Sequence, residues 1–311
     1  MRHGSLKIDL YVLAAVLAVT ISSLLFPEIM ISLRYYILGL SMLLIGIPHG
    51  AIDHLISSKL YNLKGDTTDR LKFYIPYLLL MLLMGLVWIL SGLAGFILFA
   101  LITMYHFGQA DIEHFNFPIT ARWVLIFSRG LMILSLIIFV NVSYTFPVIA
   151  EATGFALQEM EWLIENGYLL GMILGLQHPI IMLAASYRFR QRLPSAWWYP
   201  VLDTLVILFL FTFNDPIIGF SIYFSLWHSM GHVMEMKEFF NEMGESFSVV
   251  KFYKLALPFT LISLAGLFLI YMVNNAYGME EEMVSLLFIL ISVLTLPHIL
   301  VVEKMLNAKA E

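Results

Sequence analysis

Long apolar runs separated by short polar breaks dominate the chain. Several of these runs reach the roughly 20 residues that a helix needs to cross the hydrocarbon core of a bilayer. The pattern therefore predicts about ten membrane-spanning helices. The predicted spans are 10–26, 33–55, 73–90, 93–113, 122–141, 168–187, 199–213, 216–236, 255–274 and 284–303. The first run follows a basic start but has no small-residue cleavage pattern, so we expect a retained helix rather than a signal peptide.

Charged residues in the connecting segments predict the orientation of the spans. With the N-terminus in the cytoplasm, all but two of the 17 lysines and arginines fall on the cytoplasmic side, as positive charges tend to do. The exceptions are Arg34, on the outer side, and Arg129, which lies within a span and is expected to reach towards the inner headgroups. The outer side collects Glu151, Glu159, Glu161, Glu165 and Glu280–Glu282. Both termini are therefore predicted to be cytoplasmic.

Composition agrees with a membrane protein. The 311 residues are 60% hydrophobic and 13% charged, with a mean hydropathy of +0.87. We expect one all-α polytopic bundle, residues 1–311, as a single domain in the cell (plasma) membrane, the inner membrane of a bacterium. The chain has no cysteine, which excludes disulfides and thiolate metal sites. The small net charge of −5 has no pattern and argues against a nucleic-acid partner.

The histidines show the clearest organisation. Apart from His3, all of them lie on or just beyond even-numbered spans, which run from the outside to the inside. Four follow the outer end of their spans by about 12 to 16 residues, which places them roughly 18 to 24 Å deep at 1.5 Å per residue. These four are His49, His106, His228 and His298. Imidazoles at one depth, in a medium where polar groups are costly, predict a metal centre.

The neighbours of these histidines favour the same interpretation. His228 and His232 are four residues apart and lie on one helix face. Nearby polar residues are candidates to accept a ligand N–H and orient the ring; they are Asp53, His54, Asp111, Glu235 and His298. The alternatives are ordinary hydrogen bonds between helices, an interfacial role for His54 and direct metal binding by His298. His114 and His178 are expected to be structural. Imidazole ligands suit iron, zinc, copper or nickel, and the pattern does not choose among them.

Three motifs resemble those of the Brp/Blh family of membrane β-carotene 15,15′-dioxygenases. They read Pro48-His49-Gly50-Ala51-x-Asp53-His54, Tyr105-His106-Phe107-Gly108-x-x-Asp111 and Trp227-His228-Ser229-x-x-His232, and Pro297-His298 is also similar. The resemblance implies Fe(II)-dependent cleavage of the central double bond of β-carotene by O2, giving two molecules of all-trans-retinal. It implies that the iron ligands, and through the iron the catalytic residues, are His49, His106, His228 and His232.

This substrate is compatible with the composition. β-Carotene is an apolar rod about as long as the hydrocarbon core is thick, so an enzyme within the bilayer can take it directly from lipid. Aromatic and methionine side chains beside the proposed ligands are candidates to line a flat slot: Tyr105, Phe107, Phe224, Trp227, Met230 and Met234. The expected partners are β-carotene, O2, the lipid bilayer and a rhodopsin that receives the retinal.

Three other functions compete with this hypothesis. A transporter with a histidine relay would place polar residues through the full bilayer depth, whereas the histidines here gather in one layer. A membrane di-iron desaturase or hydroxylase would carry a His-x-x-His-His run, which the chain lacks. A protein that binds carotene or retinal without cleaving it, as a rhodopsin accessory protein, remains an alternative.

Overall fold

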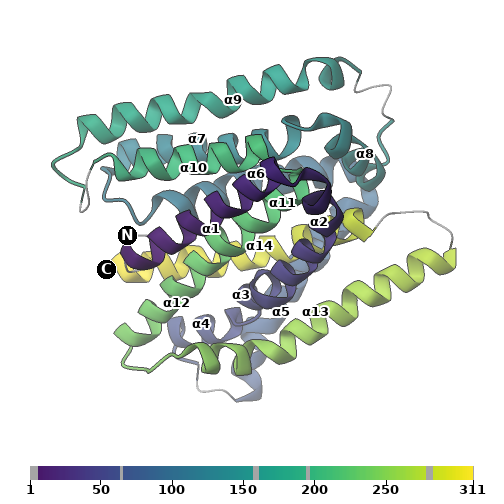
Figure 1. Cartoon of the computed structure of the whole chain (residues 1–311). Coiled ribbons are helices and arrows are strands. Elements are labelled where there is room, and N and C mark those ends of the chain that lie inside the picture. The colour runs from purple at the N-terminus through teal and green to yellow at the C-terminus, as the bar shows by residue number, and fades with distance from the viewer. Residues whose placement is uncertain (1–5, 64–65, 157–160, 194–196, 278–282, 311) are drawn as a thin grey trace. The chain divides into compact units, whose positions relative to one another are not determined.

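Helices make up nearly all of the described chain. A computed structural model describes residues 6–63, 66–156, 161–193, 197–277 and 283–310, and within these ranges there is no strand (Figure 1). The elements are α1 (Leu6–Leu25), α2 (Pro27–Ser41), the π-helix η1 (Met42–Gly46), α3 (Ile47–Gly50), α4 (Asp53–Leu60), α5 (Thr67–Leu90), α6 (Gly92–Ile112), α7 (Ile119–Phe139), α8 (Val142–Thr153), α9 (Glu161–Arg188), α10 (Tyr199–Phe213), α11 (Pro216–Ile222), the π-helix η3 (Tyr223–Ser229), α12 (Met230–Glu242), α13 (Val249–Tyr277) and α14 (Met283–Ala310). The predicted all-α class is confirmed.

In the part of the chain that the structure describes, seven helical segments are long and apolar enough to cross a membrane. They cover Pro27–Leu60, Thr67–Leu90, Gly92–Ile112, Ile119–Phe139, Glu161–Arg188, Val249–Ala276 and Val284–Ala308. The apolar helices at Tyr11–Leu25 and Tyr199–Phe213 are shorter, and the predicted eighth span is divided among α11, η3 and α12. The length and apolar composition of these helices indicate a membrane protein. The number of ten spans and the orientation of the termini remain predictions.

Apolar side chains on the outside of the helices support contact with lipid. Leu82 and Ile89 of α5 are 68% and 83% exposed, and Leu269 of α13 is 63% exposed. Apolar surface of this extent is unfavourable in water and is expected where acyl chains provide the solvent. Of the residues used to predict orientation, Arg2, Lys64, Glu159 and Glu280–Glu282 lie outside the described residues, as does His3.

The chain divides into two compact units, each assembled from three segments. Unit 1 comprises Met1–Ile45, Thr103–Phe146 and Leu157–Met234, and unit 2 comprises Gly46–Ile102, Pro147–Ala156 and Glu235–Glu311. Each unit is described separately below. Neither is continuous in the sequence, so neither corresponds to a domain that composition or a linker would predict.

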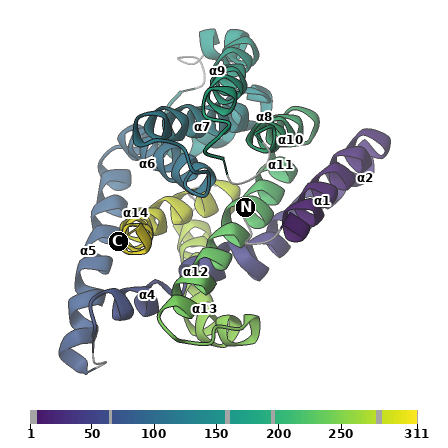
Figure 2. The same ribbon diagram turned by 90° about the vertical axis from the view of Figure 1, so that its left-hand side faces the viewer.

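In unit 1, α7 lies beside α9, and α9 also packs on α10 (Figures 1 and 2). Glycines permit the closest of these contacts. A Cβ at Gly171 of α9 would lie only 2.6 Å from Cβ of Phe139 in α7. At the crossing of α6 and α7, a Cβ at Gly108 would overlap the carbonyl oxygen of Ile126, and one at Gly130 would overlap that of Met104. Small residues let helix backbones approach in this way in membranes.

In unit 2, α14 packs along α5, α4 and α13. Trp88 of α5 is buried, and its indole N–H donates to the hydroxyl of Ser292 in α14 at 2.5 Å. Ser285 of α14 donates to Glu151 of α8 at 2.9 Å. These bonds satisfy polar groups that would otherwise be buried without partners, and they fix the register of α14 against its neighbours.

The backbone contact between α6 and α7 generates a stability prediction. Gly108→Ala should lower the free energy of unfolding by about 2 kcal/mol or more, because the new methyl group collides with backbone that cannot rotate away. Gly85→Ala in α5 is the matched control, since no atom lies within 4 Å of the position that its new methyl group would take. Thermal unfolding in detergent measures the stability of both variants. Equal stability of the two would contradict the close backbone contact between α6 and α7.

Candidate functional site

Two imidazoles meet inside unit 1. His106 of α6 and His228 of η3 have ring centroids 4.8 Å apart at an interplanar angle of 79°. Their exposed fractions are 3% and 2%, and His232, four residues after His228 in α12, is 4% exposed. The structure therefore brings the second and third sequence motifs together and buries all three of their histidines.

The wide turn η3 determines how His228 is presented. The N–H of Met230 donates to the carbonyl of Ser225, five residues earlier, so the turn holds more residues than an α-helical turn. The hydroxyl of Ser225 donates to the carbonyl of Ser221 at 2.6 Å, and such bonds to the preceding turn bend helices. The sequence predicted a regular helix here. The sequence did not predict the π-helical turn, because one extra residue in a turn hardly changes the spacing of hydrophobic positions.

Aromatic side chains enclose the ring of His228. Phe224, one turn earlier, stacks on it with centroids 5.5 Å apart and planes 18° apart. Phe107 of α6 lies 4.8 Å from the same ring and 5.4 Å from Tyr223. Of the six predicted substrate-lining residues, Phe107 and Phe224 therefore lie directly against a proposed metal ligand.

The other four predicted lining residues have different surroundings. Tyr105 stacks on a tryptophan of α7 with centroids 6.0 Å apart. Trp227 is 2% exposed, and its indole N–H donates to Oδ1 of Asp203 at 3.1 Å. Met230 and Met234 in α12 are half-buried. Trp227 thus has a buried polar partner that the sequence did not predict.

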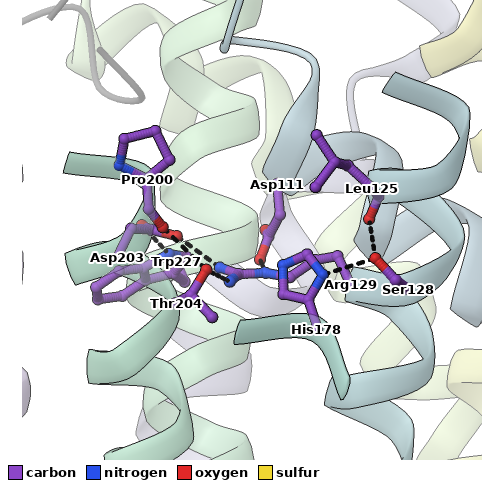
Figure 3. A network of polar contacts seen from close by, with 9 residues as sticks. All are labelled: Asp111, Leu125, Ser128, Arg129, His178, Pro200, Asp203, Thr204 and Trp227. Atoms are coloured by element: carbon purple, nitrogen blue, oxygen red, sulfur yellow. Dashed lines mark hydrogen bonds and ion pairs between the residues drawn. The ribbon is translucent and has the colours of Figure 1, made fainter. Parts of the chain in front are cut away.

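Trp227 belongs to a buried ionic network centred on Arg129 of α7 (Figure 3). Arg129 is fully buried, and its Nε donates to Oδ2 of Asp111 at 2.9 Å while its Nη2 donates to Oδ2 of Asp203 at 2.6 Å. Its Nη1 also donates to the hydroxyl of Thr204 at 3.0 Å. The prediction that Arg129 reaches the headgroups is therefore wrong. Two carboxylates inside unit 1 satisfy the guanidinium, so the side chain has no need to leave the interior.

Asp203 is a polar residue of this site that sequence reasoning missed. It stands in the apolar run 199–213, as Arg129 stands in 122–141. Two opposite charges in separate apolar spans are expected to pair, because an isolated ion in the membrane interior is costly. That signal could have identified the pair. The additional bond from Asp203 to Trp227 required the tertiary structure.

In unit 2, Nδ1 of His49 contacts a backbone carbonyl. The π-helix η1 ends at Gly46, just before Pro48, which lacks a backbone N–H, and Nδ1 of His49 hydrogen-bonds to the carbonyl oxygen of Gly46. A carbonyl oxygen only accepts, so Nδ1 is the donor in this bond and carries a proton. Histidines that bind metals commonly donate their second N–H to a carbonyl or carboxylate. The hydrogen bonding of His49 therefore fits a metal ligand.

Asp53 connects two further side chains in this unit. It is 2% exposed, and its Oδ2 accepts from the hydroxyl of Tyr77 at 2.9 Å and lies 2.9 Å from Nδ1 of His298. The ring of His298 in turn lies 5.1 Å from the ring of His49, at an interplanar angle of 88°. The structure thus joins Asp53 and His298, two of the residues predicted to orient ligands, and places His298 against His49.

The remaining predicted orienting residues lie in other environments. His54 of α4 is half-buried, with its ring 4.5 Å from that of Phe259 and stacked on Tyr74 at 6.5 Å. Glu235 is half-buried in α12, three residues after His232. The aromatic neighbours of His54 match the interfacial alternative as well as the orienting one.

An open groove with a volume of about 520 Å³ runs along unit 2 between α4, α5 and α14. Its lining is mostly apolar and includes Pro76 and Tyr77 of α5 and Pro297 of α14. The hydroxyl of Tyr77 is the one that binds Asp53. Tyr77 therefore links the wall of the groove to the carboxylate that contacts His298.

The donor chemistry fits a metal, although neither unit holds a complete set of ligands. Among the residues that the structure describes, no three histidine or carboxylate side chains converge to hold an ion. The imidazoles instead form two pairs, His106 with His228 and His49 with His298. Neutral imidazoles suit iron, zinc, copper or nickel, and Nδ1 of His49 and of His298 each contacts an oxygen acceptor, as the second ring nitrogen of a metal-binding histidine commonly does.

These features define a class of protein: an all-helical membrane protein with paired, buried imidazoles. The family model described as β-carotene 15,15′-dioxygenase matches residues 40–306. The chain belongs to this family, and the resemblance predicted from the motifs is confirmed. The prediction of a carotenoid-cleaving enzyme of the β-carotene 15,15′-dioxygenase type is confirmed with it.

Two relatives with this activity in their names are similar to the chain over most of their length. The probable β-carotene 15,15′-dioxygenase Blh of Halobacterium salinarum is 28% identical over 293 residues, which cover 88% of this chain and 84% of the relative. The β-carotene 15,15′-dioxygenase of the uncultured marine bacterium 66A03 is 23% identical over 263 residues, covering 83% and 89%. No solved structure matches the chain.

The hydrogen bond between Tyr77 and Asp53 generates a second prediction. Tyr77→Phe should lower the free energy of unfolding by about 1 kcal/mol, the typical net contribution of one hydrogen bond. Tyr74→Phe, three residues earlier in α5, is the control, because Tyr74 contacts His54 through its ring. Denaturant unfolding of the solubilised protein measures the difference. If both variants lost the same stability, the bond to Asp53 would not be the cause.

Proposed function

We propose that this protein cleaves the central double bond of β-carotene with O2 to give two molecules of all-trans-retinal. The observation that carries the proposal is the family match, because residues 40–306 include all of the histidine motifs. The reaction balances without a further reductant: the carbon–carbon double bond breaks, and each of its two carbons gains one of the two oxygen atoms of O2.

The proposed cofactor is Fe(II), held by His49, His106, His228 and His232. The motifs support this set, as do the close approach of His106 to His228 and the hydrogen bond from Nδ1 of His49 to the carbonyl of Gly46. When bound, the iron supplies a site where dioxygen is activated beside the double bond. Side chains proposed to orient the ligand rings are Asp53, His54, Asp111, Glu235 and His298. Contacts of Asp53 with His298, and of His298 with His49, support this role for two of them.

The protein's own contribution is to position the polyene and to exclude water. Phe107 and Phe224 lie flat or tilted against His228 and are buried, so they offer an apolar wall beside a proposed ligand. Positioning of this kind, rather than acid–base chemistry, would decide which double bond is cleaved. Tyr105, Trp227, Met230 and Met234 are proposed to extend the same slot.

The membrane location suits both the substrate and the product. β-Carotene dissolves in the hydrocarbon core, whose thickness is about the length of the molecule, and O2 is apolar as well. We propose that the protein lies in the cell (plasma) membrane with both termini in the cytoplasm. From there the retinal can pass through lipid to a rhodopsin.

A colour assay tests the proposed activity directly. Expression of the chain in a carotene-accumulating bacterium should remove the yellow colour and produce retinal, which chromatography of the extract identifies. His228→Ala should abolish the product, because it removes a proposed ligand. His114→Gln, a histidine outside the motifs, should keep it.

Two results would overturn the proposal. Unchanged carotene with folded, metal-loaded protein would favour a carotenoid-binding accessory protein that does not cleave. Full activity of His228→Ala would remove that histidine from the ligand set.

Metal removal tests the proposed cofactor separately. Treatment of the purified protein with a chelator should stop retinal formation, and Fe(II) should restore it under air but not without oxygen. Zinc should not restore it, because zinc has no redox chemistry. Recovery of activity with zinc, or undiminished activity after verified removal of iron, would exclude iron as the cofactor.

A further inference from the structure

We propose that Arg129 is a positioning residue that sets the separation between His106 and His228. It does so through two carboxylates, one on the helix that carries His106 and one bonded to the residue next to His228. The inference rests on the proposed function for its effect on metal binding and catalysis. It concerns only residues of unit 1.

The first link runs from Arg129 to His106. Asp111 receives the Nε–H of Arg129 at 2.9 Å and lies in α6, five residues after His106. The same two helices touch through their backbones at Gly108 and Gly130. Arg129 precedes Gly130, so the ion pair and the backbone contact lie next to each other on α7. Together they prevent α6 from sliding or turning against α7.

The second link runs from Arg129 to His228. Asp203 uses Oδ2 to accept from Arg129 at 2.6 Å and Oδ1 to accept from the indole N–H of Trp227 at 3.1 Å. Trp227 directly precedes His228 in the π-helical turn η3. A π-helical turn is a rare conformation, and the bond from Trp227 to Asp203 on α10 ties the residues within this turn to a neighbouring helix.

The guanidinium is suited to this role because it is planar and presents several N–H groups in fixed directions. Here it contacts Asp111, Asp203 and Thr204 at once, on α6 and α10 (Figure 3). A lysine carries one compact ammonium group and cannot span these partners. All of the groups are buried, where solvent does not screen their interactions.

Trp227→Phe separates positioning from mere stabilisation. This variant removes the bond to Asp203 but keeps the aromatic packing and the ion pairs of Arg129. If the network only stabilised the fold, the proposed metal site would be unaffected. If the network positions His228, loss of its last link should weaken metal binding, as changes to groups that orient metal ligands do by 10- to 100-fold.

The experiment uses Co(II) as a spectroscopic probe on the full-length, metal-free protein in detergent. Trp227→Phe should bind Co(II) at least about tenfold more weakly than the wild type, with altered visible absorption bands. Trp88→Phe is the matched control, since Trp88 is also buried and donates its indole N–H to a side chain, but in unit 2. It should bind Co(II) within about twofold of the wild type at a similar melting temperature.

Arg129 itself is tested in the same assay. Arg129→Lys should also bind Co(II) more weakly than the wild type. The control is Arg122→Lys: Arg122 lies on α7 like Arg129 and pairs with Glu113, and its replacement should leave the Co(II) affinity unchanged. In the carotene assay, Trp227→Phe should reduce kcat more than it changes KM. If Arg129→Lys does not fold, the Co(II) affinity of Trp227→Phe still tests the positioning role of the network.

The outcomes distinguish the two proposals. Unaltered Co(II) affinity and spectrum in Trp227→Phe, or an equal loss in Trp88→Phe, would overturn the positioning role while leaving carotene cleavage by the wild type intact. Weakened Co(II) binding in Trp227→Phe, with no cleavage by the wild type, would support the positioning role and reject the proposed function. A wild type that binds no Co(II) would overturn the positioning role together with the metal site.

Discussion

The guanidinium of Arg129 can be buried in an apolar interior only because Asp111, Asp203 and Thr204 surround it. Charges removed from water must be paired and hydrogen-bonded, since an uncompensated ion costs several kcal/mol (about 3–5 when one partner of a buried pair is lost). This requirement forces α6, α7 and α10 into one arrangement. The arrangement extends through Asp203 to Trp227, and so to the turn that carries His228.

The motifs of His49 and His228 share two local features. In each, a π-helical segment adjoins the histidine: η1 ends at Gly46, three residues before His49, and η3 contains His228. In each, the imidazole lies against a second imidazole at about 5 Å, His298 or His106. Wide turns shift the direction of side chains relative to a regular helix. Such shifts are frequent at functional sites and agree with the proposed role of these histidines as ligands.

Sequence reasoning succeeded where a strong physical constraint acts on neighbouring residues. Apolar runs of about 20 residues predicted the long helices, and the three histidine motifs predicted the family that the comparison confirms. It failed where the answer depends on residues distant in the chain. Arg129 was expected at the headgroups because its partners lie 18 and 74 residues away, and finding them requires the charges of separate spans to be compared rather than the pattern within one span.

The sequence by itself determined the helical class, the membrane character, the family and the motifs that hold the candidate ligands. These follow from composition, from periodicity and from short spacings along one helix. Only the tertiary structure decided that Asp203 joins Arg129 to Trp227, that Asp53 contacts His298, and that the helix carrying His228 is wound as a π-helix. The physical reason is that buried polar groups hydrogen-bond to whichever groups lie nearby in three dimensions. The periodicity along one helix does not show which groups of other helices those are.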